Sequence, residues 1–241
     1  SQVEGGITKL YFSGGDRKII ESKLSKLPQI LKAQWQWDVL AKKDWHLKWQ
    51  KNFQPVFIDD KIAIIPSWKK SAKAEIIVKI KPGMAFGTGH HESTCLMLHL
   101  MSKCLRPGMS MLDLGTGSGI LAITANKLGA VHIDAVEFDS DCRENFLENL
   151  KLNNMTGAIP LHIENILNWE KYKYDLITAN INRNVFQNLL PLLSGSPALM
   201  LISGILDKDF PKISQLCSEN NLYVQNKKVK GEWIALEIKS K

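Results

Sequence analysis

Three glycines at alternating positions, Gly115, Gly117 and Gly119, follow a short apolar run at residues 110–114. The run predicts a buried strand, and the apolar spacing from Ile120 onward predicts a helix. Glycines between a strand and a helix let the backbone approach a ligand closely, and the free amides at the helix N-terminus can bind a polar or anionic group. The segment therefore predicts a nucleotide-binding turn.

The spacing of these glycines distinguishes two classes of nucleotide ligand. A dinucleotide-binding loop has its third glycine one position later, where this chain has Ile120. The alternating pattern is instead typical of enzymes that bind S-adenosylmethionine, which has an adenosine but no pyrophosphate. We therefore expect S-adenosylmethionine as the cofactor. A tight turn that binds no ligand is the alternative interpretation.

A carboxylate follows at the end of the next predicted strand, residues 132–137. This residue, Glu137, can accept hydrogen bonds from both hydroxyls of a ribose. Ligands of open α/β sheets bind at the carboxyl edge of the strands. We therefore expect Glu137 and Gly115 to border one crevice, although they are far apart in the sequence.

Two later strands end close to asparagines. Asn165 follows the predicted strand 159–163, where its amide can meet the edge of an adenine. Asn180 follows the predicted strand 174–179, where an amide can either cap a helix or accept a hydrogen bond from an incoming amine. We assign Asn180 to the site as the candidate catalytic residue, and we assign Asn182 to the helix cap.

A second glycine-containing segment, residues 86–94, precedes another predicted helix. It can close over the methionine end of the cofactor, with the hydroxyl of Ser93 or Thr94 bonded to the amino-acid moiety. A simple helix start is the alternative interpretation. The candidate cofactor-binding residues are therefore Thr94, Gly115, Gly117, Glu137, Asn165 and Asn180.

Strands and helices alternate from Ser110 onward, which predicts a parallel sheet with helices on both faces. The predicted strands are 110–114, 132–137, 159–163, 174–179 and 198–203, and the predicted helices are 118–129, 140–153, 184–193 and 208–219. Two final strands, 222–230 and 232–239, form an antiparallel hairpin that turns at Gly231. The predicted fold class is α/β, a doubly wound, mainly parallel seven-stranded sheet.

The chain divides into three predicted segments. Residues 1–43 predict a small α+β domain, residues 44–75 a connector, and residues 76–241 the catalytic domain. The predicted elements of the first two segments are strands at 7–12 and 30–39, helices at 16–26 and 44–52, and a hairpin at 55–66.

The charge balance favours an acidic partner. The formal net charge is +7 and the sequence pI is near 9.1, which fits nucleic acid or a nucleoprotein particle. Lysines cluster at 42–43, 69–73 and 227–230, although such runs are also typical of solvated faces. Contact with RNA is therefore an open expectation.

Other functional classes find little support. No apolar run approaches the roughly 20 residues that span a bilayer, and the first residues lack the pattern of a signal peptide. We therefore expect a cytoplasmic protein without a membrane segment. The four cysteines stand far apart, and the adjacent residues 90–92 have no second ligand cluster, so we expect no metal site.

Several short strings of the sequence form a pattern together: Asp44-Trp45 with Trp49, Asn52-Phe53, Pro66-Ser-Trp68, Phe86-Gly-Thr-Gly-His90 with Thr94, Leu112 to Ala122, Ala179-Asn-Ile181 and Ser203-Gly-Ile-Leu206. This pattern resembles the ribosomal protein L-eleven methyltransferase (PrmA) family of class I S-adenosylmethionine-dependent methyltransferases. The strings cover most of the chain and are far more specific together than any one of them alone.

The resemblance implies a Rossmann-like catalytic domain with an N-terminal recognition domain. It also implies that Thr94, Gly115, Glu137 and Asn180 contact the cofactor, and that the acceptors are lysine side chains and the N-terminal amine of a large-subunit ribosomal protein. This chain differs from the family in two respects. The family usually has aspartate at the position of Glu137, and its recognition domain is longer than the residues that precede Asp44 here, so we expect a shortened N-terminal domain.

The expected reaction is a direct in-line displacement, in which a neutral amine attacks the sulfonium methyl and S-adenosylhomocysteine leaves. The protein aligns the reactants and excludes water, while Asn180 orients the lone pair of the amine. We expect a monomer.

Two alternative functions stay open. One is a methyltransferase that acts on RNA or a small molecule, and the other is a non-catalytic module that keeps the cofactor fold and docks on ribosomes.

Overall fold

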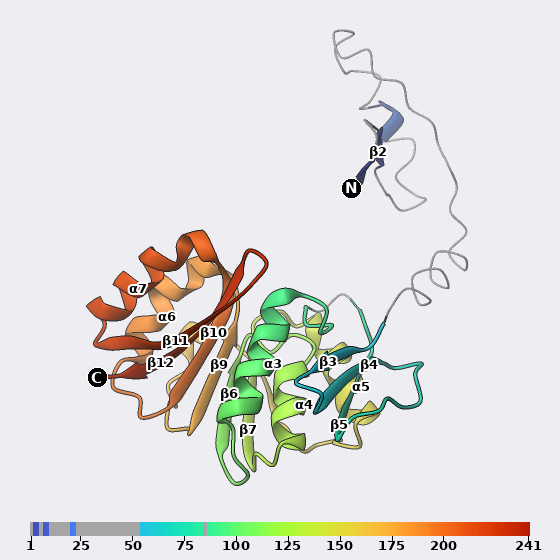
Figure 1. The fold of residues 1–241 in the computed structure, drawn as a ribbon, viewed down its shortest axis with the longest axis horizontal. Coiled ribbons are helices and arrows are strands. Elements are labelled where there is room, and N and C mark those ends of the chain that lie inside the picture. The colour runs from blue at the N-terminus through green and yellow to red at the C-terminus, as the bar shows by residue number, and fades with distance from the viewer. Residues whose placement is uncertain (1, 5–6, 10–19, 23–53, 84–85) are drawn as a thin grey trace. The chain divides into compact units, whose positions relative to one another are not determined.

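The computed structural model describes residues 2–4, 7–9, 20–22, 54–83 and 86–241 (Figure 1). The chain forms two compact units, Ser1–Gln50 and Lys51–Lys241. In the first unit, strands β1 (Gln2–Glu4) and β2 (Ile7–Lys9) pair in antiparallel fashion, and residues 20–22 are helical. The predicted strand at 30–39 and the predicted helix from Asp44 lie outside the described residues.

The second unit is built on a seven-stranded sheet with the order β11-β12-β10-β9-β6-β7-β8. Its strands are β6 (Ser110–Leu114), β7 (His132–Glu137), β8 (Leu161–Ile163), β9 (Leu176–Asn180), β10 (Leu199–Leu206), β11 (Leu222–Lys230) and β12 (Trp233–Ser240). Strands β6 to β10 are parallel, and β12 runs antiparallel to both of its neighbours. The predicted mainly parallel sheet with a C-terminal antiparallel hairpin is confirmed.

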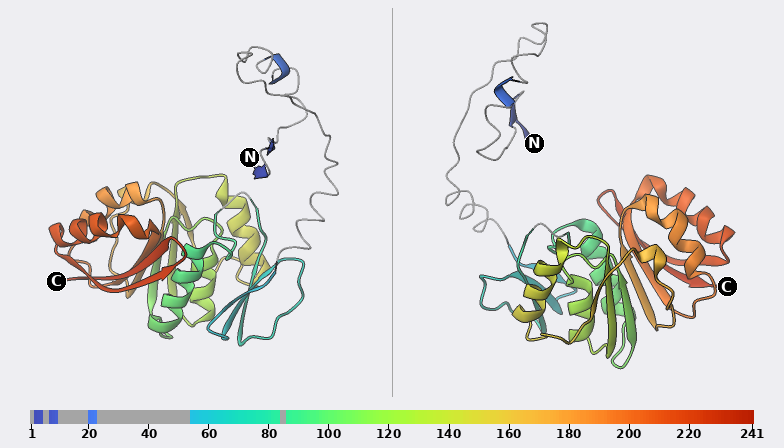
Figure 2. Two further views of the ribbon diagram at one scale, coloured as in Figure 1. Left: turned by 45° about the horizontal axis from the view of Figure 1, so that its top comes forward. Right: turned by 180° about the vertical axis from the view of Figure 1, so that it is seen from behind.

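Helices cover both faces of this sheet. They are α3 (Glu92–Cys104), α4 (Ile120–Lys127), α5 (Cys142–Leu152), α6 (Phe186–Leu193) and α7 (Phe210–Glu219), with short 3-10 turns η3 (Ile166–Asn168), η4 (Arg183–Val185) and η5 (Asp207–Asp209). One core cluster joins α3, α4 and α5 to the sheet, and a second joins α6 and α7, which lie together beside the C-terminal strands (Figures 1 and 2).

The residues of β6 show why both faces need a helix layer. Side chains alternate across a strand, so Met111 enters the first core cluster while Leu112 and Leu114 enter the second. All three are fully buried. A near-continuous apolar strand is therefore stable only between two layers of helices, which is the doubly wound arrangement.

A smaller sheet of three strands, β3 (Val56–Ile58), β4 (Ile62–Pro66) and β5 (Ile76–Ile80), belongs to the same unit. The predicted hairpin is present, since β3 and β4 pair in antiparallel fashion, whereas β5 is parallel to β4. Every residue of β4 is buried, and Ile62 and Ile64 belong to the first core cluster. The hairpin, which the sequence analysis assigned to the connector, thus packs into the core because β4 is apolar on both faces.

Candidate active site

The order of the strands reverses at β6. From β6 the chain passes to β7 and β8 on one side, and it then continues to β9 and β10 on the other side. Parallel α/β sheets bind ligands at such a switch point, outside the carboxyl ends of the strands. Gly115 follows β6, Glu137 ends β7 and Asn180 ends β9. The topology therefore brings these three predicted site residues to one edge of the sheet.

The glycine turn has the tight backbone that the sequence indicates. Gly115, Gly117 and Gly119 all have positive φ, at 72°, 53° and 81°. At Gly117 a side chain is also excluded by packing, because a Cβ atom there would lie 2.7 Å from the carbonyl oxygen of Phe86. The turn is held against the next strand, since the amides of Gly115 and Thr116 both donate to the Val136 carbonyl, at 2.9 and 3.1 Å.

Glu137 is fixed beside this turn by two backbone amides. Its Oε2 accepts a hydrogen bond from the Gly117 amide at 2.9 Å, and its Oε1 accepts one from the Asp139 amide at 3.0 Å. Each carboxylate oxygen has a further lone pair. The carboxylate is therefore held in place while both oxygens can still accept hydrogen bonds from a pair of hydroxyls.

Asn180 meets Thr94 across the sheet edge. The Asn180 Nδ2 atom donates to the Thr94 Oγ1 atom at 3.3 Å, and Thr94 is fully buried. Thr94 was expected in a segment before a helix, whereas it lies in the first turn of α3. The other end of the Asn180 amide, Oδ1, is buried and has no hydrogen-bond partner among the described residues.

A buried acceptor without a partner is unusual. More than about 90% of buried polar groups are paired in folded proteins, and an unpaired one costs about 1–3 kcal/mol. An N–H donor on a ligand would satisfy Asn180 Oδ1. This atom is the chemical feature of the edge that points most directly to a ligand.

Asn165 has a structural contact that the sequence analysis did not expect. It precedes η3, and its Oδ1 accepts a hydrogen bond from the Leu167 amide at 3.0 Å. Its amino group remains available to donate to a ring nitrogen. Its neighbour Ile166 is 7% exposed and belongs to the second core cluster. Asn182 caps η4 as predicted, since its Oδ1 accepts from the Asn184 amide at 3.0 Å.

The buried carboxylate of Asp113 links the glycine turn to β9. Asp113 accepts hydrogen bonds from the hydroxyls of Thr116 at 2.7 Å and Thr178 at 2.6 Å. Its complete burial raises its pKa to about 6, against the opposing effect of the two hydroxyls, and nearby Glu137 adds to the increase. This role of Asp113 was not predicted, although an aspartate inside an otherwise apolar strand indicates a specific polar contact.

A β-bulge brings the segment after Asn180 against β10. The pairing of β10 with β12 shifts between Ile202 and Ile205, and Gly204 within this bulge has a φ of 83°. A Cβ atom at Gly204 would overlap the carbonyl oxygen of Ile181. Only glycine therefore allows this approach, which explains why glycine follows Ser203 in the string at 203–206.

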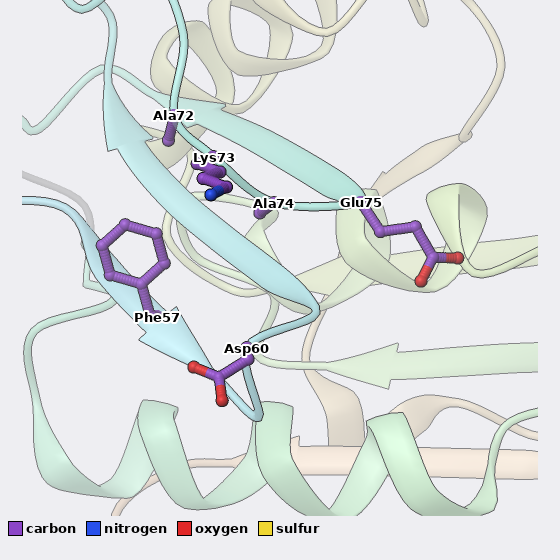
Figure 3. Close-up of a pocket in the computed structure, with 6 residues that line it drawn as sticks. All are labelled: Phe57, Asp60, Ala72, Lys73, Ala74 and Glu75. Atoms are coloured by element: carbon purple, nitrogen blue, oxygen red, sulfur yellow. The ribbon is translucent and has the colours of Figure 1, made fainter.

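The cavity in Figure 3 is separate from this edge. It has a volume of about 720 Å³ and is lined by Phe57, Asp60, Ala72, Lys73, Ala74 and Glu75, which come from β3, the β3–β4 turn and the segment before β5. None of the predicted site residues lines it. The cavity therefore gives no information about the chemistry at the switch point.

The described parts of the chain contain no group of three or more metal-ligating side chains. None of the helices in those parts has the length and apolar character that a membrane crossing requires.

The four cysteines, Cys95, Cys104, Cys142 and Cys217, have free thiols, and burial raises the pKa of Cys104 and of Cys217 to about 11.

The sequence profile of one protein family, described as Ribosomal protein L11 methyltransferase (PrmA), matches residues 7–241. The chain belongs to the PrmA family. A curated relative from Lactobacillus johnsonii with that name is 38% identical over 208 residues, which cover 84% of this chain and 66% of the relative. Another from Dictyoglomus turgidum is 30% identical and is covered to 74% of its length.

A solved structure supports the same assignment. The ribosomal protein L11 methylase from Lactobacillus delbrueckii subsp. bulgaricus aligns with a TM-score of 0.73 at 32% identity, over 78% of this chain and all of that chain. This chain spans just under two thirds of several curated PrmA relatives, for example 64% of the Ruminiclostridium cellulolyticum protein. The Rossmann-like methyltransferase fold of the unit with the seven-stranded sheet is thus established.

Proposed function

We propose that this protein is an S-adenosylmethionine-dependent methyltransferase whose acceptors are amines of ribosomal protein L11, namely lysine side chains and the N-terminal amine. The observation that carries the proposal is the buried, unpartnered Oδ1 of Asn180 at the switch point of the sheet. An amine offers the N–H donor that this oxygen lacks among the described residues. Membership of the PrmA family supports the identity of the acceptor protein.

The residues at the sheet edge fit the proposed cofactor. The glycine turn allows a close backbone approach, and the fixed carboxylate of Glu137 suits the two ribose hydroxyls. The amino group of Asn165 suits an adenine ring nitrogen, while the Thr94 hydroxyl suits the amino-acid moiety. When bound, S-adenosylmethionine supplies an electrophilic methyl group on a sulfonium.

Asn180 then has a defined part in the reaction. Its Oδ1 accepts a hydrogen bond from the neutral acceptor amine, which directs the nitrogen lone pair at the methyl group. An amide is not basic, so Asn180 orients the amine and does not remove its proton. Alignment of this kind contributes several of the roughly 7–11 kcal/mol that positioning can supply to a two-reactant step.

The decisive experiment supplies labelled S-adenosylmethionine together with purified L11, ribosomal RNA or ribosomes that lack the modification. We expect label on L11, and mass spectrometry of its peptides will locate the methylated amines. Label on RNA alone would identify an RNA methyltransferase, which is the alternative suggested by the net charge of +7. Cofactor binding without label on any fraction would indicate a docking module.

A further inference from the structure

Three asparagines spaced four residues apart, Asn145 and Asn149 on α5 and Asn153 at its C-cap, bond to the edge of the small sheet. The strand β5 lies at that edge, where alternate backbone groups are left unpaired by the sheet itself. Asn153 bonds both groups of Lys79, accepting from its amide at 3.0 Å and donating to its carbonyl at 2.7 Å. Asn145 donates to the Lys81 carbonyl at 3.0 Å, and Asn149 accepts from the Lys81 amide at 2.7 Å.

Asn149 differs from the other two because it also reaches the glycine turn. Its Nδ2 donates to the carbonyl oxygen of Ser118 at 2.8 Å, while its Oδ1 holds the Lys81 amide. The side chain is fully buried. It therefore bridges the glycine turn and Lys81, the residue that follows β5, and Figure 1 shows α5 beside that strand.

Ser118 connects the same turn to the second glycine segment. Its amide donates to the Phe86 carbonyl at 3.0 Å, and its hydroxyl donates to the Gly87 carbonyl at 2.6 Å. With the bond from Asn149, every polar group of Ser118 is used. Ser118 therefore holds the glycine turn against Phe86 and Gly87, and Asn149 links Ser118 to Lys81.

We propose that Asn149 is a positioning residue for the cofactor, an inference that rests on the proposed function. Ser118 stands between Gly117 and Gly119, and glycine itself imposes little conformational preference. Bonds from outside the turn must therefore select its conformation. The Asn149 side chain fixes the Ser118 carbonyl, and with it the peptide plane that leads into Gly119. A turn that is ordered before binding loses less conformational entropy when the cofactor binds.

The test compares Asn149→Ala with Asn153→Ala, which loses two part-buried bonds to β5 and one to the Asn149 carbonyl but no contact with the turn. Calorimetry with S-adenosylmethionine should show about tenfold weaker binding for Asn149→Ala, the effect of one lost buried hydrogen bond. The Kd of Asn153→Ala should stay within about twofold of the wild type, although thermal unfolding should show that both variants are less stable. In turnover assays, Asn149→Ala should raise the KM for the cofactor and leave kcat unchanged.

Equal Kd values for the two variants would overturn the positioning role and leave the proposed function intact. A wild type that binds no S-adenosylmethionine would instead overturn the proposed function, and this inference with it. If Asn149→Ala does not fold, Asn149→Asp replaces it. The aspartate keeps the acceptor for Lys81 and loses the donor for Ser118, so the same increase in Kd is expected, and an unchanged Kd overturns the role.

Discussion

The two sides of the candidate site at the sheet edge differ in how completely their polar groups are paired. On the β6–β7 side, the Glu137 carboxylate already holds the Gly117 and Asp139 amides. On the β9–α3 side, the Asn180 Oδ1 atom is buried and unpaired among the described residues. We propose that the paired side binds the cofactor, while the unpaired side keeps an acceptor for the amine that reacts. Four substitutions probe this difference.

The largest effect is expected on the unpaired side, from Asn180→Ala. Removal of the orienting acceptor should lower kcat by about 100-fold, since small losses of alignment at a reacting centre have effects of that size. The Kd for S-adenosylmethionine, measured by calorimetry, should change by less than about threefold. Asn182→Ala is the matched control, because Asn182 caps η4 and has no assigned part in the reaction. Equal turnover in the two variants would remove Asn180 from the mechanism.

On the paired side, Glu137→Ala should weaken cofactor binding rather than lower kcat. Loss of charge-assisted hydrogen bonds should weaken cofactor binding by about 10- to 100-fold. At saturating cofactor, kcat should remain close to that of the wild type. Glu164→Ala, at an exposed glutamate after β8, controls for the change in net charge. An unaltered Kd for Glu137→Ala would contradict the ribose assignment.

Gly117→Ala tests the rigidity of the paired side. The new Cβ atom would lie 2.7 Å from the Phe86 carbonyl oxygen, so the backbone must shift. The free energy of unfolding should fall by about 1–3 kcal/mol more than in Gly157→Ala. Gly157 is the control because it also has positive φ, at 75°, whereas a Cβ atom there would have no neighbouring atom within 4 Å. Denaturant titration measures both, and similar losses would mean that the contact with Phe86 does not constrain the turn.

The last prediction concerns Asp113→Asn and is a change in the pH dependence of stability. Burial raises the pKa of Asp113 from 3.8 to about 6, so the folded protein binds a proton more tightly than the unfolded chain. The stabilisation that this proton contributes is complete below about pH 4 and is lost as the pH rises through about 6. Between these values, the wild type should therefore gain stability relative to Asp113→Asn as the pH falls. A pH-independent difference in Tm would refute the raised pKa.

The sequence predicted the β6–β7 side well. The bounds of β6 and β7 agree with prediction at both ends, since β6 stops at Gly115 and β7 ends on the charged Glu137. The glycine turn was predicted from spacing alone because positive φ is a local property of the chain. The confirmed α/β class follows from the alternation of strand and helix patterns.

The β9–α3 side could be predicted only in part. Asn180 stood out as a polar residue at the end of a strand, but the lack of a partner for its Oδ1 depends on α3, which is distant in the sequence. The burial of the β3–β4 hairpin also depends on distant residues. Its apolar residues pack against helices that follow it along the chain, and a local pattern does not reveal that burial.

The sequence by itself determined the order of the elements, the glycine turn and the types of residue at the strand ends, because these depend on neighbours within a few positions. The tertiary structure decided which side chains meet: Thr94 with Asn180, Asp113 with Thr178, and Asn149 with Ser118. These contacts join residues 31 to 86 positions apart. They form only when the sheet brings its strand ends together and excludes water, which makes each buried polar group require a partner.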